Sequence, residues 1–255
     1  MNELSCTPVA VRLAVLDIGS TLVEGPSRGP ASRIAEAAGL DDDQRSRLRR
    51  ALMCEPFTQA EDVISFAATH GLDGQGRSPG RLTKPGRPDR FADAVRKVWS
   101  LQEQEADALP GAAEALYAMH AAGLHLALAS NIWQPYLTAV RRTFGDTIDA
   151  LVAPELQLFS FREGRAKPDP SMFERALSRA GVSPEEAVMV GDSYAEDIAP
   201  AQTLGMRTVW VLRRPQREAP AVQRVQRGER RAPTLTVASI AGAAGLLRAP
   251  QARAA

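Results

Sequence analysis

Cysteine, lysine and long apolar runs are all scarce in this sequence of 255 residues. The two cysteines, Cys6 and Cys54, cannot build a disulfide framework and lack the spacing of metal ligands. No apolar stretch approaches the roughly 18 residues that span a bilayer, and the first apolar run leads directly into Asp17, unlike a secretion signal. The 31 basic and 30 acidic residues nearly cancel, which removes the electrostatic basis for binding nucleic acid or an anionic membrane. We therefore expect a cytoplasmic protein without nucleic-acid or membrane partners.

The sequence does contain short aliphatic runs that alternate with helical patterns, as in parallel sheets covered by helices. Asp169 and Pro170 predict the start of one helix, Gly181 predicts its end, and Ser183 and Glu186 have the spacing of a capping box. We predict an α/β fold with a Rossmann-like parallel sheet flanked by helices. The predicted strands are Val11–Leu16, Leu124–Ala129, Ile148–Val152, Ala187–Val190, Thr208–Leu212 and Leu235–Val237.

A long insertion separates the first predicted strand from the second. It spans about a hundred residues, where an ordinary crossover needs about thirty. Apolar residues repeat there with helical spacing, as at Phe91, Val95 and Val98, and a break rich in glycine, proline and arginine covers residues 74–90. We therefore expect a helical domain inserted after the first strand. The predicted domains are a core of residues 1–22 and 109–255 and a helical domain of residues 23–108.

Four polar clusters follow predicted strands or precede a predicted helix, and open parallel sheets place their ligands at the carboxyl ends of strands. Each cluster alone has an ordinary explanation as a loop cap, a turn, a surface lysine or a helix N-cap. Lysine is informative here because it supplies only three of the 31 basic residues. The clusters are Asp17-Ile18-Gly19-Ser20-Thr21, Ser130-Asn131, Lys167-Pro168-Asp169-Pro170 and the segment from Gly191 to Asp197.

In this order the four clusters resemble the haloacid dehalogenase-like hydrolase superfamily, whose members are mostly phosphatases that form an aspartyl-phosphate. The resemblance covers nearly the whole chain, and the insertion is similar to the helical cap of that superfamily. It implies a Mg²⁺-dependent phosphatase that acts on a small phosphorylated metabolite. An inserted cap shields the cleft, which favours small substrates over folded phosphoproteins.

The resemblance also implies roles for individual residues. Asp17 matches the catalytic nucleophile, and Ser130 and Asn131 match residues that bind the phosphate. Lys167 matches a catalytic and phosphate-binding lysine that balances charge on the nucleophile and on the phosphoryl oxygens. Together Mg²⁺ and this lysine would offset the three carboxylates, so that a phosphate dianion meets a neutral site. The implied metal ligands are Asp17, the backbone carbonyl of Gly19, Asp192 and Asp197.

Gly19 departs from the pattern of the superfamily. Its phosphatases usually carry a second aspartate there, which protonates the leaving oxygen and later activates water. Glycine can do neither, and general acid–base catalysis is typically worth about 10²–10⁴ in rate. If another part of the chain supplies a substitute acid, His70 and Glu24 are the candidates.

Two other classes of function stay open: a non-catalytic protein, and a different hydrolase of the same fold, either a dehalogenase or a phosphonate hydrolase. A non-catalytic phosphate-binding or regulatory protein is compatible with Gly19 and with the arginine-rich segment 213–233, which we interpret as a solvated loop or, alternatively, a polyanion site. A dehalogenase would use Asp17 to attack carbon without a metal. A phosphonate hydrolase would need a Schiff-base lysine, for which the insertion offers Lys84 and Lys97. The substrate and the oligomeric state are not encoded in any motif that we recognise.

Overall fold

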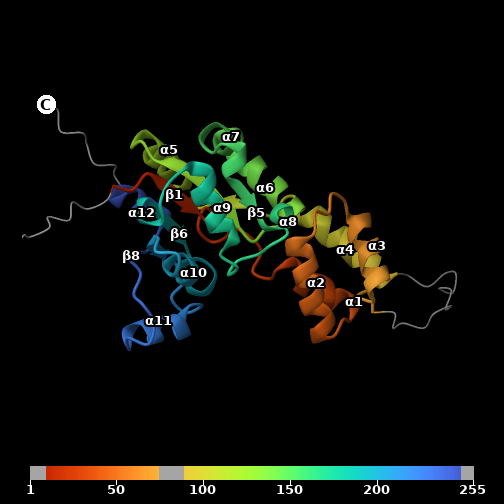
Figure 1. Ribbon diagram of the computed structural model, residues 1–255. Coiled ribbons are helices and arrows are strands. Elements are labelled where there is room, and N and C mark those ends of the chain that lie inside the picture. The colour runs from red at the N-terminus through yellow and green to blue at the C-terminus, as the bar shows by residue number, and fades with distance from the viewer. Residues whose placement is uncertain (1–9, 75–88, 248–255) are drawn as a thin grey trace, which may run out of the picture.

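The core of the protein is a six-stranded sheet in the order β5-β4-β1-β6-β7-β8, in which every neighbouring pair is parallel. It is seen in a computed structural model that describes residues 10–74 and 89–247, and helices flank it (Figure 1). The predicted α/β fold is thereby confirmed. The strands are β1 (Leu13–Leu16), β4 (His125–Ser130), β5 (Gln157–Phe159), β6 (Ala187–Gly191), β7 (Arg207–Val211) and β8 (Leu235–Val237).

One predicted strand is wrong. Residues 148–152 fall in and just after helix α7 (Thr147–Leu151), and the strand beside β4 is β5. Ile148 and Val152 are buried while the residues between them are exposed or half-buried, which is the period of a helix. A five-residue apolar run fits either structure by composition alone. The true edge strand is short and begins with the polar Gln157, so it carries no comparable apolar signal.

The helices of the core begin and end close to the predicted signals. Gly181 ends α9 in the left-handed region, with φ at 62°. The predicted capping box between Ser183 and Glu186 is present, although it opens a single 3₁₀ turn. Asp169 accepts the backbone N–H of Ser171 at 3.0 Å. The helix itself begins at Ser171, one residue later than the predicted start at Pro170. The core helices are α5 (Ala112–Ala121), α6 (Gln134–Phe144), α7, α8 (Ser160–Glu163), α9 (Ser171–Ala180), α10 (Ala199–Thr203), α11 (Ala219–Gln226) and α12 (Ile240–Leu246), with a π-helical turn η3 (Tyr194–Ile198) before α10.

The inserted helices form a cap with an apolar cluster of its own, at the right of Figure 1. Phe91, Val95 and Val98 are buried in that cluster, as their spacing predicted. Trp133, which follows β4 in the core, packs into the same cluster against Trp99, with ring centroids 5.3 Å apart. The cap helices are α1 (Pro30–Ala38), α2 (Asp42–Cys54), α3 (Ala60–His70) and α4 (Arg90–Gln102).

A short ribbon joins the cap to the sheet domain. Strand β2 (Val23–Glu24) leaves the core just after the loop that follows β1, and β3 (Asp107–Ala108) returns beside it in antiparallel pairing. The backbone N–H of Leu109 then donates to the carbonyl of Leu22 at 2.9 Å. The chain therefore enters and leaves the cap at one place, next to the end of the central strand.

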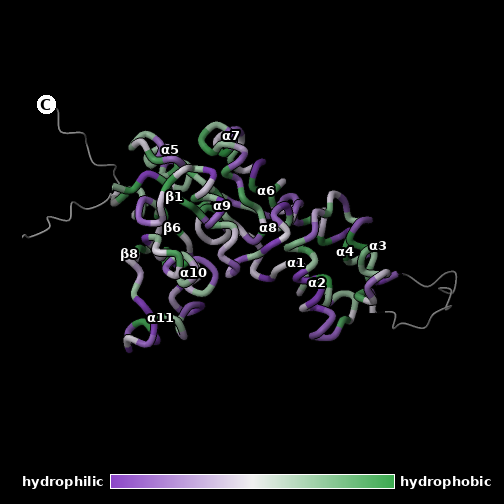
Figure 2. Tube along the Cα trace, viewed as in Figure 1, coloured by the Kyte–Doolittle hydropathy of each residue, from purple (hydrophilic) through white to green (hydrophobic). Residues whose placement is uncertain are grey.

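The arginine-rich segment 213–233 is not simply a solvated loop. It contains α11, whose Ala221, Val222 and Val225 pack against a cluster that includes Tyr194 and Trp210. The turns around α11 are largely hydrophilic in Figure 2, and the helix projects from the sheet domain. Among the helices that the structure describes, none has the length and hydropathy needed to cross a membrane.

Candidate active site

The predicted site residues meet where the strand order changes direction. β1 lies between β4 and β6, and the register pairs Leu16 with Leu128 on one side and Val190 on the other. The backbone N–H of Asp17 donates to the carbonyl of Val190 at 2.9 Å, which fixes Asp17 at the carboxyl end of β1. Because parallel strands end at the same edge, the clusters that follow β1, β4 and β6 are brought together.

Lys167 lies at the centre of this edge and is only 4% exposed. Its Nζ donates to Oδ1 of Asp17 at 2.8 Å and to Oδ1 of Asp197 at 2.5 Å. Burial by itself would lower the pKa of Lys167, but the two carboxylates more than compensate and raise it, so the ammonium keeps its charge. Ser130 donates its hydroxyl to the same Oδ1 of Asp17 at 3.0 Å. Within the described residues Oδ2 of Asp17 accepts no hydrogen bond, and it is the freer oxygen.

Asn131 holds the backbone of Lys167 on both sides. Its Oδ1 accepts the N–H of Lys167 at 2.7 Å, and its Nδ2 donates to the Lys167 carbonyl at 2.9 Å. The second Nδ2 hydrogen goes to Glu196 at 3.1 Å. Both amide hydrogens of Asn131 are thus engaged within the protein. The contacts of this side chain position Lys167, and its predicted contact with phosphate stays a prediction.

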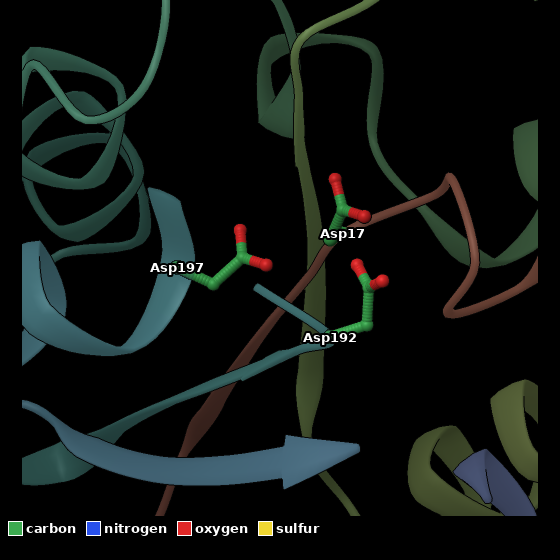
Figure 3. Close-up of side chains that lie close together, drawn as sticks. All are labelled: Asp17, Asp192 and Asp197. Atoms are coloured by element: carbon green, nitrogen blue, oxygen red, sulfur yellow. The ribbon is translucent and has the colours of Figure 1, made fainter. Parts of the chain in front are cut away.

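Three carboxylates converge beside the lysine. Asp17, Asp192 and Asp197 each offer an oxygen within 4.8 Å of the others, and Figure 3 shows them facing a common space. Burial first, and then the charges of Asp17 and Asp197, raise the pKa of Asp192 to about 8. Burial and the charge of Asp17 outweigh Lys167 and raise the pKa of Asp197 to about 7. When all three carboxylates are ionised, they carry more negative charge than one lysine balances.

Two glycines in this edge have opposite surroundings. A Cβ at Gly191 would lie 2.4 Å from the carboxyl carbon of Asp197, so only glycine lets that carboxylate approach the end of β6. A Cβ at Gly19 would meet no heavy atom within 4 Å, and its φ lies outside the positive range. The backbone hydrogen bonds of its turn leave the Gly19 carbonyl unused in the described part of the chain. Position 19 is therefore spacious, and its carbonyl is available to a ligand.

Neither candidate for a substitute acid is arranged as one. His70 stacks on Phe66 and its Nδ1 lies 2.8 Å from the Phe66 carbonyl. It borders a cavity of about 410 Å³ whose lining comes from the cap alone. Glu24 forms ion pairs with Arg213 and Arg214. Partial burial would raise the pKa of Glu24, but hydrogen bonds from the two guanidiniums outweigh it and lower that pKa, which makes Glu24 a poor proton donor.

Sequence reasoning missed Tyr136. It lies on the first turn of α6 and packs against both the core cluster and the cap cluster. A Cβ at Gly25 would lie 2.3 Å from its hydroxyl oxygen, so Gly25 is needed for this packing. Burial, and then the charges of Asp17 and Glu24, raise the pKa of Tyr136, so the hydroxyl keeps its proton. A single tyrosine in an amphipathic helix gives no sequence signal for such a position.

The parallel sheet, the inserted helical cap and the cluster of carboxylates at the edge of the sheet define a capped α/β protein with a candidate metal-binding site. The sequence matches the family description haloacid dehalogenase-like hydrolase over residues 11–205. The chain belongs to that family, as the motifs predicted.

Curated relatives include several phosphatases. Phosphoserine phosphatase of Thermus thermophilus is 50% identical over 58 residues, which is 23% of each chain. Ribulose-1,5-bisphosphate 5-phosphatase of Halopiger xanaduensis is 31% identical over 146 residues, which is 56% of each chain. The chain thus spans about a quarter to just over half of the length of these two relatives.

Solved structures resemble the chain over almost its whole length. The 2-haloacid dehalogenase of Pseudomonas syringae has a TM-score of 0.59 at 20% identity and covers 93% of this chain and 98% of its own. A phosphatase of the same family from Thermococcus onnurineus has a TM-score of 0.55 at 18% identity, covering 95% and 100%. At these identities the likeness concerns the fold.

Proposed function

We propose that the chain is a Mg²⁺-dependent phosphatase that acts on a small phosphorylated metabolite through a covalent intermediate on Asp17. The observation that carries this proposal is the buried Lys167, which bridges Asp17 and Asp197 while Oδ2 of Asp17 accepts no hydrogen bond from the described residues. A carboxylate held by one oxygen and open at the other is arranged for attack. The phosphatases among the curated relatives support the substrate class, because their names specify small phosphorylated metabolites.

The reaction proceeds in two displacements at phosphorus. Oδ2 of Asp17 forms a bond to phosphorus while the bond to the leaving oxygen breaks, and that oxygen departs with the electron pair. Water then attacks the phosphorus of the acyl phosphate. The bond between phosphorus and Asp17 breaks, which frees inorganic phosphate and restores the carboxylate. Because Gly19 has no side chain that could donate a proton, the leaving oxygen takes its proton from water.

The neighbours of Asp17 orient this chemistry and balance its charge. Lys167 holds Oδ1 in place and offsets negative charge as the phosphate approaches. Asn131 fixes the backbone of Lys167, and the carboxylates of Asp17 and Asp197 hold its ammonium. We assign Ser130 and Asn131 to the phosphate-binding side of the site on the strength of their position at the end of β4.

The residues at this edge fit a Mg²⁺ ion. Carboxylate and carbonyl oxygens are the ligands that a hard cation prefers. Burial first, and then the neighbouring carboxylates, raise the pKa of Asp192 and of Asp197, and a bound cation would favour their charged forms. The ligands we propose are Asp17, the Gly19 carbonyl, Asp192 and Asp197. Bound there, Mg²⁺ would polarise a phosphoryl oxygen and neutralise its charge.

The competing functions are less well supported. A dehalogenase needs no cation, so it gives no reason to bring three carboxylates together when two of them are buried. A phosphonate hydrolase needs a lysine from the cap, but Lys97 is exposed on α4 and Lys84 lies outside the described residues. The alternative of a non-catalytic binding protein is excluded as soon as turnover of any phosphate is measured.

We also propose the division of labour within the chain. Residues 1–22 and 109–255 form the catalytic core, and residues 23–108 form the cap that selects a small substrate. The ribbon of β2 and β3 lies at this boundary. A cytoplasmic location stays a prediction from composition.

The decisive experiment is a screen of phosphorylated metabolites with Mg²⁺ and after treatment with EDTA. We expect turnover only with Mg²⁺, and a rise in melting temperature that corresponds to about 2.7 kcal/mol when Mg²⁺ is present at a hundred times its Kd. Asp192→Asn should abolish that rise, whereas Asp93→Asn, an exposed aspartate of the cap, should preserve it. Phosphate release that survives EDTA undiminished would contradict the Mg²⁺ requirement, whereas a chain that hydrolyses none of these phosphates would leave the dehalogenase and the non-catalytic protein as the alternatives.

A further inference from the structure

Two consecutive arginines converge on one carboxylate beside the site. Arg213 and Arg214 follow β7, and each donates through one Nη2 to a different oxygen of Glu24 in β2. The three side chains are partly buried, with 30%, 26% and 37% exposed in that order. They join segments about 190 residues apart in the sequence and together carry one net positive charge.

This arginine pair borders the catalytic edge. β7 lies next to β6, with Trp210 opposite Gly191, and the Trp210 indole donates to the Asp192 carbonyl at 2.9 Å. On the other side, Glu24 is followed by Gly25, whose backbone lies against the Tyr136 hydroxyl. The arginines thus contact the segment that follows the nucleophile and come directly after the strand that lies beside β6.

The ion pairs with Glu24 leave most of the donors unused. A guanidinium has five N–H groups in a rigid fork that matches carboxylate and phosphate. Arg213 and Arg214 each commit one nitrogen to Glu24, and no other partner of these side chains occurs within residues 10–74 and 89–247. The Nε of Arg213 is buried and has no acceptor there, although buried donors are nearly always satisfied.

We infer that Arg213 and Arg214 bind a second anionic group of the substrate, a carboxylate or a phosphate, while its first phosphate reaches Asp17. The inference rests on the proposed phosphatase function and adds a substrate class to it. The catalytic cluster with Mg²⁺ is neutral before a phosphate dianion enters, so it offers no cation to a second negative charge. The arginine pair supplies one, and its contact with Glu24 demonstrates the binding of an oxyanion at this position.

Matched pairs of substrates test this inference. Glycerol 3-phosphate and 3-phosphoglycerate differ by a carboxylate, and ribose 5-phosphate and ribose 1,5-bisphosphate differ by a phosphate. We expect kcat/KM to favour the doubly anionic member of at least one pair by about 10- to 100-fold, the usual worth of a charge-assisted hydrogen bond or two. The substrate pair with the larger ratio of kcat/KM values shows whether the second anion is a carboxylate or a phosphate.

Variants connect the ratio to the arginines. Arg213→Ala and Arg214→Ala should each bring the ratio close to one. Glu24→Gln should raise it, because the substitution removes a competing anion while keeping the size of the side chain. Arg217→Ala removes the same charge from an exposed position of the same segment and should leave both activity and ratio unchanged. Melting temperatures identify any variant that fails to fold. If an arginine variant fails, Glu24→Gln still tests the inference, because it is expected to raise the kcat/KM ratio.

Binding measurements separate failure of this inference from failure of the proposed function. Calorimetry on Asp17→Asn with the same matched pairs and Mg²⁺ needs no turnover, and the doubly anionic member should bind more tightly only while both arginines are present. A ratio of one in the wild type, or a ratio that survives both arginine variants, overturns the inference while metal-dependent hydrolysis stands. Absence of hydrolysis for every phosphate, with the binding preference intact, overturns the proposed function alone.

Discussion

The catalytic edge of the sheet and the cap are stabilised by different interactions. At the edge, charged side chains lie buried against one another, and Lys167 and Asp197 are almost inaccessible to solvent. In the cap, apolar side chains fill the interior, and the ion pairs are either partly buried, as Arg33 with Glu105, or more than half exposed on both sides, as Arg96 with Glu61. Coulomb interactions are strong in the first setting and screened in the second. Small changes at the edge should therefore alter chemistry, and similar changes in the cap should not.

The largest expected contrast comes from Asp17→Asn. The amide has nearly the volume of the carboxylate but cannot attack phosphorus, so kcat should fall at least about 10³-fold. The fold should persist because one of three crowded carboxylates is neutralised while Lys167 keeps Asp197 as a partner. The matched variant in the cap is Asp93→Asn, whose activity should stay within about twofold. Residual activity of more than a few per cent in Asp17→Asn, free of contaminating phosphatase, would show that another group is the nucleophile.

Gly19→Asp should accelerate catalysis, because it restores an acidic side chain at the position where this chain departs from its family. Without an acid at position 19, the rate should depend steeply on the pKa of the leaving group, and aryl phosphates should outrun alkyl phosphates. The aspartate should flatten that dependence and accelerate alkyl phosphates most, with a ceiling of about 10²–10⁴. The structure removes the two obvious obstacles, because a Cβ meets no atom within 4 Å and φ suits any residue.

Gly19→Asn is the control for that gain, since it fills the same space without an acidic proton. Rates of a series of substituted phenyl and alkyl phosphates give the dependence directly. If the wild-type rate is already insensitive to the leaving group, another residue supplies the proton, and Tyr136 is the first to examine by substitution with phenylalanine.

Substitution of glycine by alanine adds one methyl group without a change of charge, and its effect should differ between the catalytic edge and the cap. Gly191→Ala places Cβ 2.4 Å from the Asp197 carboxyl carbon and must displace that carboxylate. Overpacking of this kind costs about 1–3 kcal/mol, so both the melting temperature and the Mg²⁺-dependent rate should fall, the latter about tenfold. Gly29→Ala, before α1 in the cap, meets nothing within 4 Å and should be neutral. Equal behaviour of the two variants would contradict the packing described here.

The sequence predicts the arrangement of the catalytic edge because that arrangement depends on local order. Asp17, Ser130 and Asp192 follow strands, and parallel strands end together, so their proximity follows from the strand pattern alone. The error at residues 148–152 arises where a short apolar run does not distinguish helix from strand.

The remaining contacts depend on tertiary packing. The docking of helices onto the sheet determines two of these contacts. It brings Asn131 to Lys167 and Glu196, and it brings Tyr136 to Gly25. The same holds for Glu24, which lies in the ribbon and meets arginines from the far end of the chain. Residue type and spacing contain no trace of these partners. The motifs therefore predict which residues meet at this edge, and the catalytic roles of those residues stay predictions. Neither His70 nor Glu24 is arranged as the substitute acid.

The smallest expected effect concerns the contact between the two regions. Arg49 on α2 lies 3.4 Å from Glu196, and Glu196 also accepts from Asn131, which holds Lys167. This chain of contacts leads from the cap to the catalytic lysine. Arg49 is 71% exposed, however, and exposed ion pairs contribute about 0.2–1 kcal/mol. Arg49→Ala and Glu196→Gln should therefore change kcat/KM by no more than about fivefold.

A double-mutant cycle on this pair tests whether the cap communicates with the edge at all. The two single variants and the double variant should have the same kcat/KM within error, since each breaks the same contact and glutamine can still accept from Asn131. Glu61→Gln, which breaks the ion pair with Arg96 inside the cap, should leave kcat/KM at the wild-type value. A loss beyond tenfold at Arg49 would mean that the cap organises Lys167 directly, and the separation between a catalytic edge and a selecting cap would then have to be abandoned.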